Sequence, residues 1–270
     1  MNANSLVGTH DVLMVTLDTL RYDVAVEALA AGETPVLRRV LPGGAWEERH
    51  SPGTFTYAAH HAFFAGFLPT PAKAGRHSRR FALRFAGSET TGAETTVFDS
   101  PDIVSGFASR GYHTLCVGGV GFFNMQNPLG CVLPGLFAEK HWRPELGVTE
   151  HRSTEFQVAQ VSASLAALPE EKRCFTFLNV SALHQPNRFY VPGAPVDSKH
   201  TQGAALAYVD SQLRALFTAV SRRAPCFVMI GSDHGTAYGE DGYTGHRLAH
   251  PVVTTVPWAE FTLPRGWSLS

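Results

Sequence analysis

The stretch VLMVTLD at residues 12–18 places six strand-forming residues directly before a carboxylate. A short apolar run of this kind is typical of a strand that is covered on both faces within a parallel sheet. Similar runs occur at residues 113–117, 174–180 and 226–230, and amphipathic helical patterns separate them. We therefore predict an α/β fold with a mostly parallel central sheet and helices on both of its faces.

Helices are expected at residues 34–40, 56–65, 102–110, 154–168 and 203–220. The 270 residues contain no compositional break that would mark a linker, so residues 1–270 are predicted to form one domain. Residues 70–100 carry four arginines among small and polar residues. We expect an exposed excursion there that borders the substrate cleft, with a solvated surface loop as the alternative.

The charge of the chain argues against two classes of partner. Its formal net charge is −1 and only 17% of its residues are charged, which disfavours nucleic acid and acidic membrane surfaces. The expected partner is a small molecule that carries a phosphate. No basic leader and no apolar stretch of about 20 residues is present, so a cytoplasmic location without a membrane partner is expected. The four cysteines lack metal-type spacing and are expected to be buried, reduced thiols.

Potential metal ligands stand where predicted strands end. Asp18 closes the first strand, and Asp233 and His234 follow the strand at residues 226–230. The carboxyl ends of strands in an open α/β sheet line one crevice, so these side chains are expected to meet there. Together with the hydroxyl of Thr56 they would suit a divalent metal, zinc or alternatively manganese. Considered alone, an acid in the position of Asp18 is more often a turn or cap residue than a metal ligand, and a threonine in the position of Thr56 usually caps a helix.

Thr56 opens the helical pattern at residues 56–65. Free N–H groups and the positive end of a helix favour an anion at this position, and a metal-bound hydroxyl ionises easily enough to attack phosphorus or sulfur. His60 lies one turn later and is expected to face the same cleft.

Three further histidines lie near predicted strand ends or the Asp233 motif. His184 follows the strand at residues 174–180, and His246 and His250 are four residues apart. We expect them to contact the substrate or a second metal. Alternatively, His184 is satisfied by a backbone hydrogen bond. His246 and His250 would share one face if their segment were a helix, but Pro251 suggests that such a helix would end there.

Short motifs recur along the chain in a fixed order. They are LDTLRYD (17–23), TPVLRRV (34–40), the helix from Thr56 with GFLP (66–69), SRGYHT (109–114) before VGG (117–119), YVDSQL (208–213), SDHG (232–235), GH (245–246) and VPW (256–258). In this order they resemble the alkaline phosphatase superfamily, specifically its sulfatase-like branch. The resemblance covers most of the chain.

The resemblance implies that Asp18, Thr56, Asp233 and His234 bind one metal ion. Thr56 would attack the ester to give a phosphothreonine that water then hydrolyses. His60 occupies the position at which sulfatases carry an arginine that contacts the anion.

Two departures narrow this expectation. Sulfatases of the main type carry a cysteine, oxidised to formylglycine, where this chain has Thr56, so phosphate is expected rather than sulfate. Two-metal members supply a further acid, and residues 179–184 contain none, so only one site is complete. The sequence thus predicts a metal-dependent hydrolase of a phosphate ester or diester. The alternatives are a phosphoryl-group transferase, a sulfatase-like esterase and a non-catalytic metal-binding protein.

Overall fold

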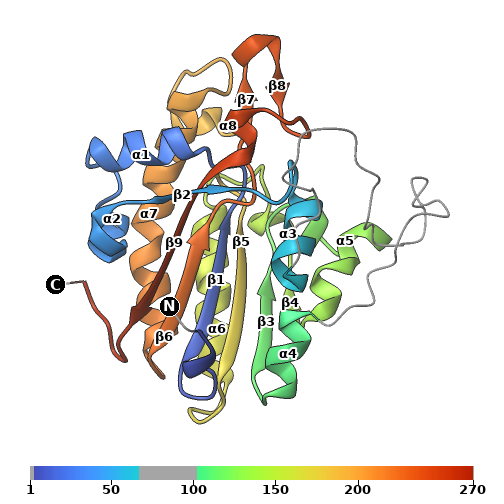
Figure 1. Cartoon of the computed structure of the whole chain (residues 1–270), viewed down its shortest axis with the longest axis vertical. Coiled ribbons are helices and arrows are strands. Elements are labelled where there is room, and N and C mark those ends of the chain that lie inside the picture. Colours follow the sequence, from blue (N-terminus) through green and yellow to red (C-terminus); the bar gives the residue numbers. More distant parts are fainter. Residues whose placement is uncertain (1–2, 67–101, 270) are drawn as a thin grey trace.

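A computed structural model describes residues 3–66 and 102–269, so the expected excursion at residues 70–100 lies outside the described residues. A seven-stranded sheet with the order β2-β9-β6-β1-β5-β3-β4 forms the centre (Figure 1). The pairings from β6 across to β4 are parallel, whereas β9 pairs antiparallel with both β6 and β2. The strands are β1 (Asp11–Leu17), β2 (Glu47–His50), β3 (His113–Val117), β4 (Glu139–His141), β5 (Cys174–Val180), β6 (Cys226–Gly231) and β9 (Thr255–Leu263).

Helices cover both faces of this sheet, as predicted. One face packs against α1 (Tyr22–Ala30), α2 (Pro35–Val40), α6 (Ser153–Ala167) and α7 (Lys199–Ser221). The other packs against α3 (Thr56–Ala65), α4 (Ile103–Ser109) and α5 (Pro128–Val132) (Figure 1). The predicted mostly parallel α/β fold is therefore confirmed.

The central strand β1 divides its side chains between two cores. Leu13, Val15 and Leu17 belong to the core under α1, α6 and α7, whereas Val12 and Met14 belong to the core under α3 and α4. Successive side chains of a strand point to opposite faces, so a strand covered on both faces is apolar throughout. This is the physical reason why residues 12–17 read as a continuous apolar run.

Short elements gather at the carboxyl edge of the strands, at the top of Figure 1. A small hairpin is formed by β7 (Ala237–Tyr238) and β8 (Thr244–Gly245), and α8 (Pro251–Thr254) follows it. Single 3-10 turns complete the described elements, at Ala3–Ser5, Pro42–Gly44, Gly121–Phe123, Pro134–Leu136, Pro144–Leu146, Arg188–Tyr190 and Glu240–Gly242.

Some elements differ from the sequence-based expectations. α7 begins at Lys199 rather than at residue 203, because Ser198 and Thr201 form a reciprocal capping box one turn earlier. The antiparallel strand β9 was not predicted, since it contains Pro257, which argues against a strand, close to the sheet edge. The four cysteines are unpaired, but Cys131 is exposed, contrary to the expectation that all four are buried.

Asp210 of α7 joins two of the sequence motifs. Its buried carboxylate accepts hydrogen bonds from the backbone N–H groups of Val36 (3.0 Å) and Leu37 (2.8 Å). Both donors lie in the first turn of α2, where Pro35 has no N–H to satisfy. Asp210 therefore caps α2 from a helix that is distant in sequence and fixes the two helices against each other.

We predict that Asp210→Ala lowers the free energy of unfolding by about 2 kcal/mol, because two buried N–H groups lose their acceptor. Asp210→Asn, which keeps one acceptor oxygen, should cost less. Urea denaturation measures both changes, with Ser211→Ala on the exposed side of the same helix as the control. Equal stability of the Ala variant and the wild type would contradict the capping role.

Candidate active site

Three of the predicted ligands meet at the carboxyl edge of the sheet. Asp18 follows β1, and Asp233 and His234 follow the neighbouring strand β6. One potential ligand atom from each of the three lies within 4.8 Å of the others, and all three residues are fully buried. The hydroxyl oxygen of Thr56 lies 3.4 Å from Asp18 Oδ2 and 3.4 Å from His234 Nε2. The structure thus brings together the four residues that the sequence selected.

Each of the two carboxylates has one oxygen bound to the protein and one without a partner. Asp18 Oδ2 accepts a hydrogen bond from the side-chain amide of Asn179 at 3.0 Å, and Asp233 Oδ1 accepts from the backbone N–H groups of Thr19 and His234. Asp18 Oδ1 and Asp233 Oδ2 are buried and have no hydrogen-bond partner. Buried polar atoms of this kind call for a partner, and a cation between the two oxygens would supply it.

The imidazole of His234 fits the same cation. Its Nδ1 lies 2.9 Å from the carbonyl oxygen of Gly235, so this nitrogen carries the proton and Nε2 presents a lone pair toward the carboxylates. A histidine held in this way, two carboxylates and a hydroxyl form a donor set suited to a divalent metal such as zinc.

Burial sets the protonation of these groups in the metal-free protein. It raises the pKa of Asp233 to about 7, and burial together with the nearby Asp233 charge raises the pKa of Asp18. Burial also lowers the pKa of His234. Two neighbouring carboxylates without a cation therefore retain protons at a pH where isolated carboxylates have lost them.

Thr56 is the first residue of α3, and the preceding residue Phe55 makes no side-chain cap. The first N–H groups of the helix are thus not satisfied by a capping side chain, which leaves donors for an oxyanion next to the Thr56 hydroxyl. The loop before α3 is held tightly, since a Cβ atom at Gly53 would lie 2.6 Å from the backbone nitrogen of Ala59. Its Ser51 hydroxyl also donates to the carbonyl oxygen of Asp233.

His60 is fully buried, and both of its ring nitrogens are engaged by the protein. Nδ1 lies 2.7 Å from the carbonyl oxygen of Thr56, and Nε2 lies 3.1 Å from the hydroxyl of Thr16. Burial lowers its pKa to about 3, so the ring is neutral. The geometry favours a positioning role behind Thr56 over the contact with substrate that the sequence suggested.

The Thr16 hydroxyl continues this chain of hydrogen bonds. It lies 3.3 Å from the side-chain amide of Asn179, which also donates to Asp18. Asn179 Oδ1 accepts from the backbone N–H of Val120. This network links α3, β1 and β5 beneath the ligand set, and the sequence analysis missed both Thr16 and Asn179. The signal available was a hydroxyl and an amide within otherwise apolar strands.

Two of the three further histidines lie beside this centre. The ring of His246 is 4.7 Å from that of His234, and the ring of His184 is 5.7 Å from that of His246, measured between centroids. The His184 Nδ1 faces the carbonyl oxygen of Gln185 at 2.6 Å, which leaves Nε2 for another partner. His246 Nδ1 is buried without a partner, and burial lowers the pKa of this ring to about 3.

His250 is engaged elsewhere. Its Nε2 lies 3.1 Å from Asp241 Oδ2, and its Nδ1 accepts a hydrogen bond from the backbone N–H of Val252 at the start of α8. Pro251 is the first residue of α8, so it begins a helix here rather than ending one. The segment that holds His246 and His250 is therefore not a helix with both rings on one face.

Arg21 forms ion pairs within the protein. This buried guanidinium pairs with Asp23, at 2.7 Å between Nη2 and Oδ2, and with Glu240. It also lies near the carbonyl oxygen of Thr236. Arg21 therefore ties the start of α1 to the segment that carries the hairpin, and its charge is neutralised within the protein.

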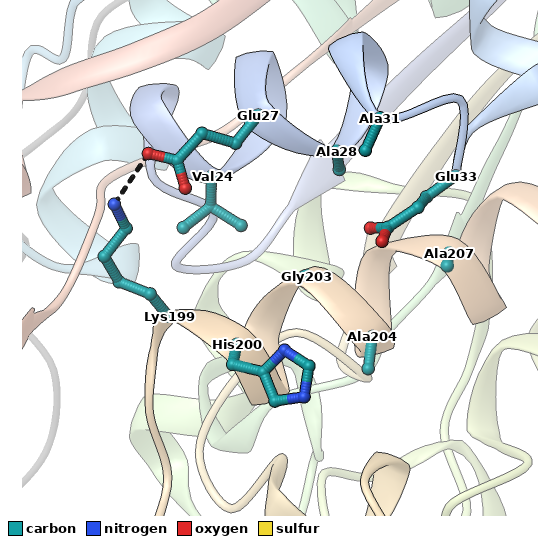
Figure 2. A pocket seen from close by; sticks show the side chains of 10 residues that line it. All are labelled: Val24, Glu27, Ala28, Ala31, Glu33, Lys199, His200, Gly203, Ala204 and Ala207. Carbon is teal, nitrogen blue, oxygen red and sulfur yellow. Dashed lines mark hydrogen bonds and ion pairs between the residues drawn. The ribbon is translucent and has the colours of Figure 1, made fainter.

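A groove of about 740 Å³ lies between α1 and α7 (Figure 2). It is floored by small residues such as Ala28 and Gly203, and Lys199 and Glu27 form an ion pair across one end. None of the candidate site residues lines this groove, so its volume gives no information about the chemistry at the strand ends.

No protein-family model matches the chain, and no curated protein matches it. Several solved structures are similar to the chain. The C-terminal periplasmic domain of phosphoethanolamine transferase EptC from Campylobacter jejuni superposes with a TM-score of 0.61 at 15% identity, covering 94% of this chain and 80% of that one. The corresponding periplasmic domain from Escherichia coli, in complex with Zn, gives 0.62 at 11% identity and covers 94% and 73%. An alkaline phosphatase superfamily protein from Vibrio parahaemolyticus gives 0.54 at 15% identity and covers 94% and 60%.

These neighbours contradict the expected cytoplasmic location, because two of them are periplasmic domains. The expectation depended on the apparent lack of a leader and of a long apolar stretch. In the described part of the chain, no helix has both the length and the apolar character needed to cross a membrane.

All three neighbours superpose over 94% of this chain. The resemblance noted in the sequence motifs is thus confirmed by the architecture, and the chain has the alkaline phosphatase superfamily fold, in its sulfatase-like form.

Proposed function

We propose that this protein is a metal-dependent enzyme that cleaves a phosphate ester, with Thr56 as the nucleophile. The observation that carries the proposal is the position of the Thr56 hydroxyl, 3.4 Å from both Asp18 and His234, beside two buried carboxylate oxygens that have no hydrogen-bond partner. The superfamily fold supports chemistry on phosphate or sulfate esters. Thr56 stands where sulfatases of the main type carry a cysteine, and this favours a phosphate ester over a sulfate ester as the substrate.

Asp18, Asp233, His234 and Thr56 would hold the metal ion. When bound, a divalent ion supplies positive charge that lowers the pKa of a hydroxyl and stabilises charge on phosphoryl oxygens. Asp18 Oδ2 lies 3.4 Å from the Thr56 hydroxyl and would accept its proton, and Asn179 holds this oxygen in place. Oγ1 of Thr56 attacks phosphorus, the bond from phosphorus to the leaving oxygen breaks, and a phosphothreonine forms.

The second half of the reaction releases the phosphoryl group. Attack of water on the phosphothreonine regenerates the Thr56 hydroxyl and gives phosphate. His184 and His246 lie beside the ligand set, and we propose that they contact the phosphoryl oxygens or a second metal ion.

A transferase is the second candidate, because the structural neighbour from Campylobacter jejuni is named a phosphoethanolamine transferase. An acceptor alcohol would then replace water in the second step. Product analysis with added alcohols separates the two: a new ester indicates transfer, and free phosphate alone indicates hydrolysis.

Replacement of Thr56 tests the nucleophile. With metal added, Thr56→Ala should lower the cleavage of nitrophenyl phosphate or bis-nitrophenyl phosphate by at least about 10³-fold, while Thr56→Ser keeps part of the rate. A short reaction of the wild type with nitrophenyl phosphate should add the mass of one phosphoryl group, and the Ala variant should not gain it. Full turnover by Thr56→Ala, with loss of turnover in Asp233→Ala, would exclude the covalent route.

Metal binding should release more protons at pH 6 than at pH 8. Burial raises the pKa of Asp233 to about 7 and that of Asp18 to about 6 in the metal-free protein, so at pH 6 Asp233 is mostly protonated and Asp18 about half protonated. Both must lose these protons to bind a cation. At pH 8 they are already ionised. We expect about one more proton per zinc ion at pH 6, measured by calorimetry in buffers of different ionisation enthalpy. Asp233→Asn should reduce this difference, and equal release at both pH values would contradict it.

His60 offers a test of positioning. His60→Ala should lower the free energy of unfolding by about 2–4 kcal/mol, because a buried ring and two hydrogen bonds are lost. It should lower kcat more than it raises KM, since the ring holds Thr56 rather than the substrate. His60→Asn, which retains a donor near the Thr56 carbonyl oxygen, should recover part of kcat. A large rise in KM with unchanged kcat would restore the anion-contact role.

A further inference from the structure

Arg247 lies against the segment that carries the candidate nucleophile. Its backbone N–H donates to the carbonyl oxygen of Thr54 at 2.8 Å. Its guanidinium carbon is 5.3 Å from the centroid of the Phe55 ring, and Phe55 directly precedes Thr56. Both the backbone and the side chain of Arg247 are therefore placed by the two residues that lead into α3.

Arg247 is also connected to the metal-ligand side of the site. It follows His246, whose ring centroid is 4.7 Å from that of His234. Arg247 thus connects the residues that lead into Thr56 with His246, which lies beside the predicted ligand His234.

The guanidinium of Arg247 has no hydrogen bond or ion pair with the residues that the structure describes, and the side chain is exposed. Arg21 differs, because its buried guanidinium is committed to Asp23 and Glu240. An arginine carries its charge at any physiological pH, and its planar donors match two oxygens of a phosphate group. Arg247 therefore presents a fixed positive charge and donors that no described residue uses.

The backbone of Arg247 has a φ of 71°, in the left-handed region that a non-glycine residue rarely adopts. Such conformations persist where the surroundings fix them, and they cluster at functional sites. Here the bond to Thr54 holds the unfavourable conformation, which aligns Arg247 with Phe55.

We propose that Arg247 is a substrate-binding residue whose guanidinium contacts the phosphoryl oxygens of the ester that Thr56 attacks. This inference rests on the proposed function. Stacking on Phe55 fixes the direction of the guanidinium, and the bond to Thr54 fixes its distance from α3. Arg247 would thereby add a permanent positive charge beside the segment that carries Thr56.

The test is calorimetric titration of zinc-loaded protein with inorganic phosphate, together with steady-state cleavage of nitrophenyl phosphate. Arg247→Ala should weaken phosphate binding by about 10- to 100-fold and raise KM more than it lowers kcat. Arg247→Lys, which keeps the charge without the planar donors, should recover part of the affinity. Arg247→Met keeps the stem over Phe55 and should behave like Ala, and it serves if the Ala variant is unstable.

Arg265→Ala is the matched control, because this exposed arginine pairs with Glu170 at the opposite edge of the sheet. It should bind phosphate as the wild type does. All variants should keep the wild-type zinc affinity and melting temperature, which a structural role of Arg247 would change. Unchanged phosphate affinity and KM in both Arg247→Ala and Arg247→Met would overturn the inference while the proposed function stands. A zinc-loaded wild type that neither binds phosphate nor cleaves an ester would overturn both.

Discussion

The site depends on two buried carboxylates held side by side. Asp18 and Asp233 follow adjacent parallel strands, so the register of β1 against β6 brings their side chains to one place. One oxygen of each is bound by Asn179 or by backbone N–H groups, and the other is left without a partner. The fold fixes the direction of both carboxylates but does not neutralise them. A buried pair of this kind is stable only with protons or a cation between the groups, and this links metal binding to pH.

The remaining polar residues can be understood by their relation to this pair. Asn179 orients Asp18, Thr16 connects Asn179 to His60, and His60 holds the first turn of α3 through the Thr56 carbonyl oxygen. A nucleophile on a helix and ligands on strands are thereby joined by a continuous set of buried hydrogen bonds. Such a set is sensitive to the loss of any member, because each deletion leaves another buried group unsatisfied.

The sequence predicted for a physical reason that Asp18, Asp233 and His234 would lie close together. Asp18, Asp233 and His234 each follow an apolar run, and the carboxyl ends of parallel strands converge whatever lies between them. The roles of residues inside the strands were harder to predict. Thr16 and Asn179 interrupt apolar strands, and nothing in the sequence indicates that they belong to one hydrogen-bond network. The antiparallel strand β9 was missed because Pro257 argues against a strand in this stretch. His60 was assigned by its spacing from Thr56, which does not reveal that its ring points into a buried cluster with Phe123 and Phe177.

The placement of charge separates the roles of the two arginines. Arg21 is buried, and Asp23 and Glu240 neutralise it, so it serves to join α1 to the segment after β6. Arg247 is exposed, lies on Phe55, and is attached by its backbone to the loop before Thr56. Sequence alone shows two arginines next to candidate ligands and gives no basis for choosing between them. The distinction comes from the partners that the fold supplies: a guanidinium with two carboxylates has little attraction left for an anion, whereas one held against an aromatic ring keeps its donors and its charge.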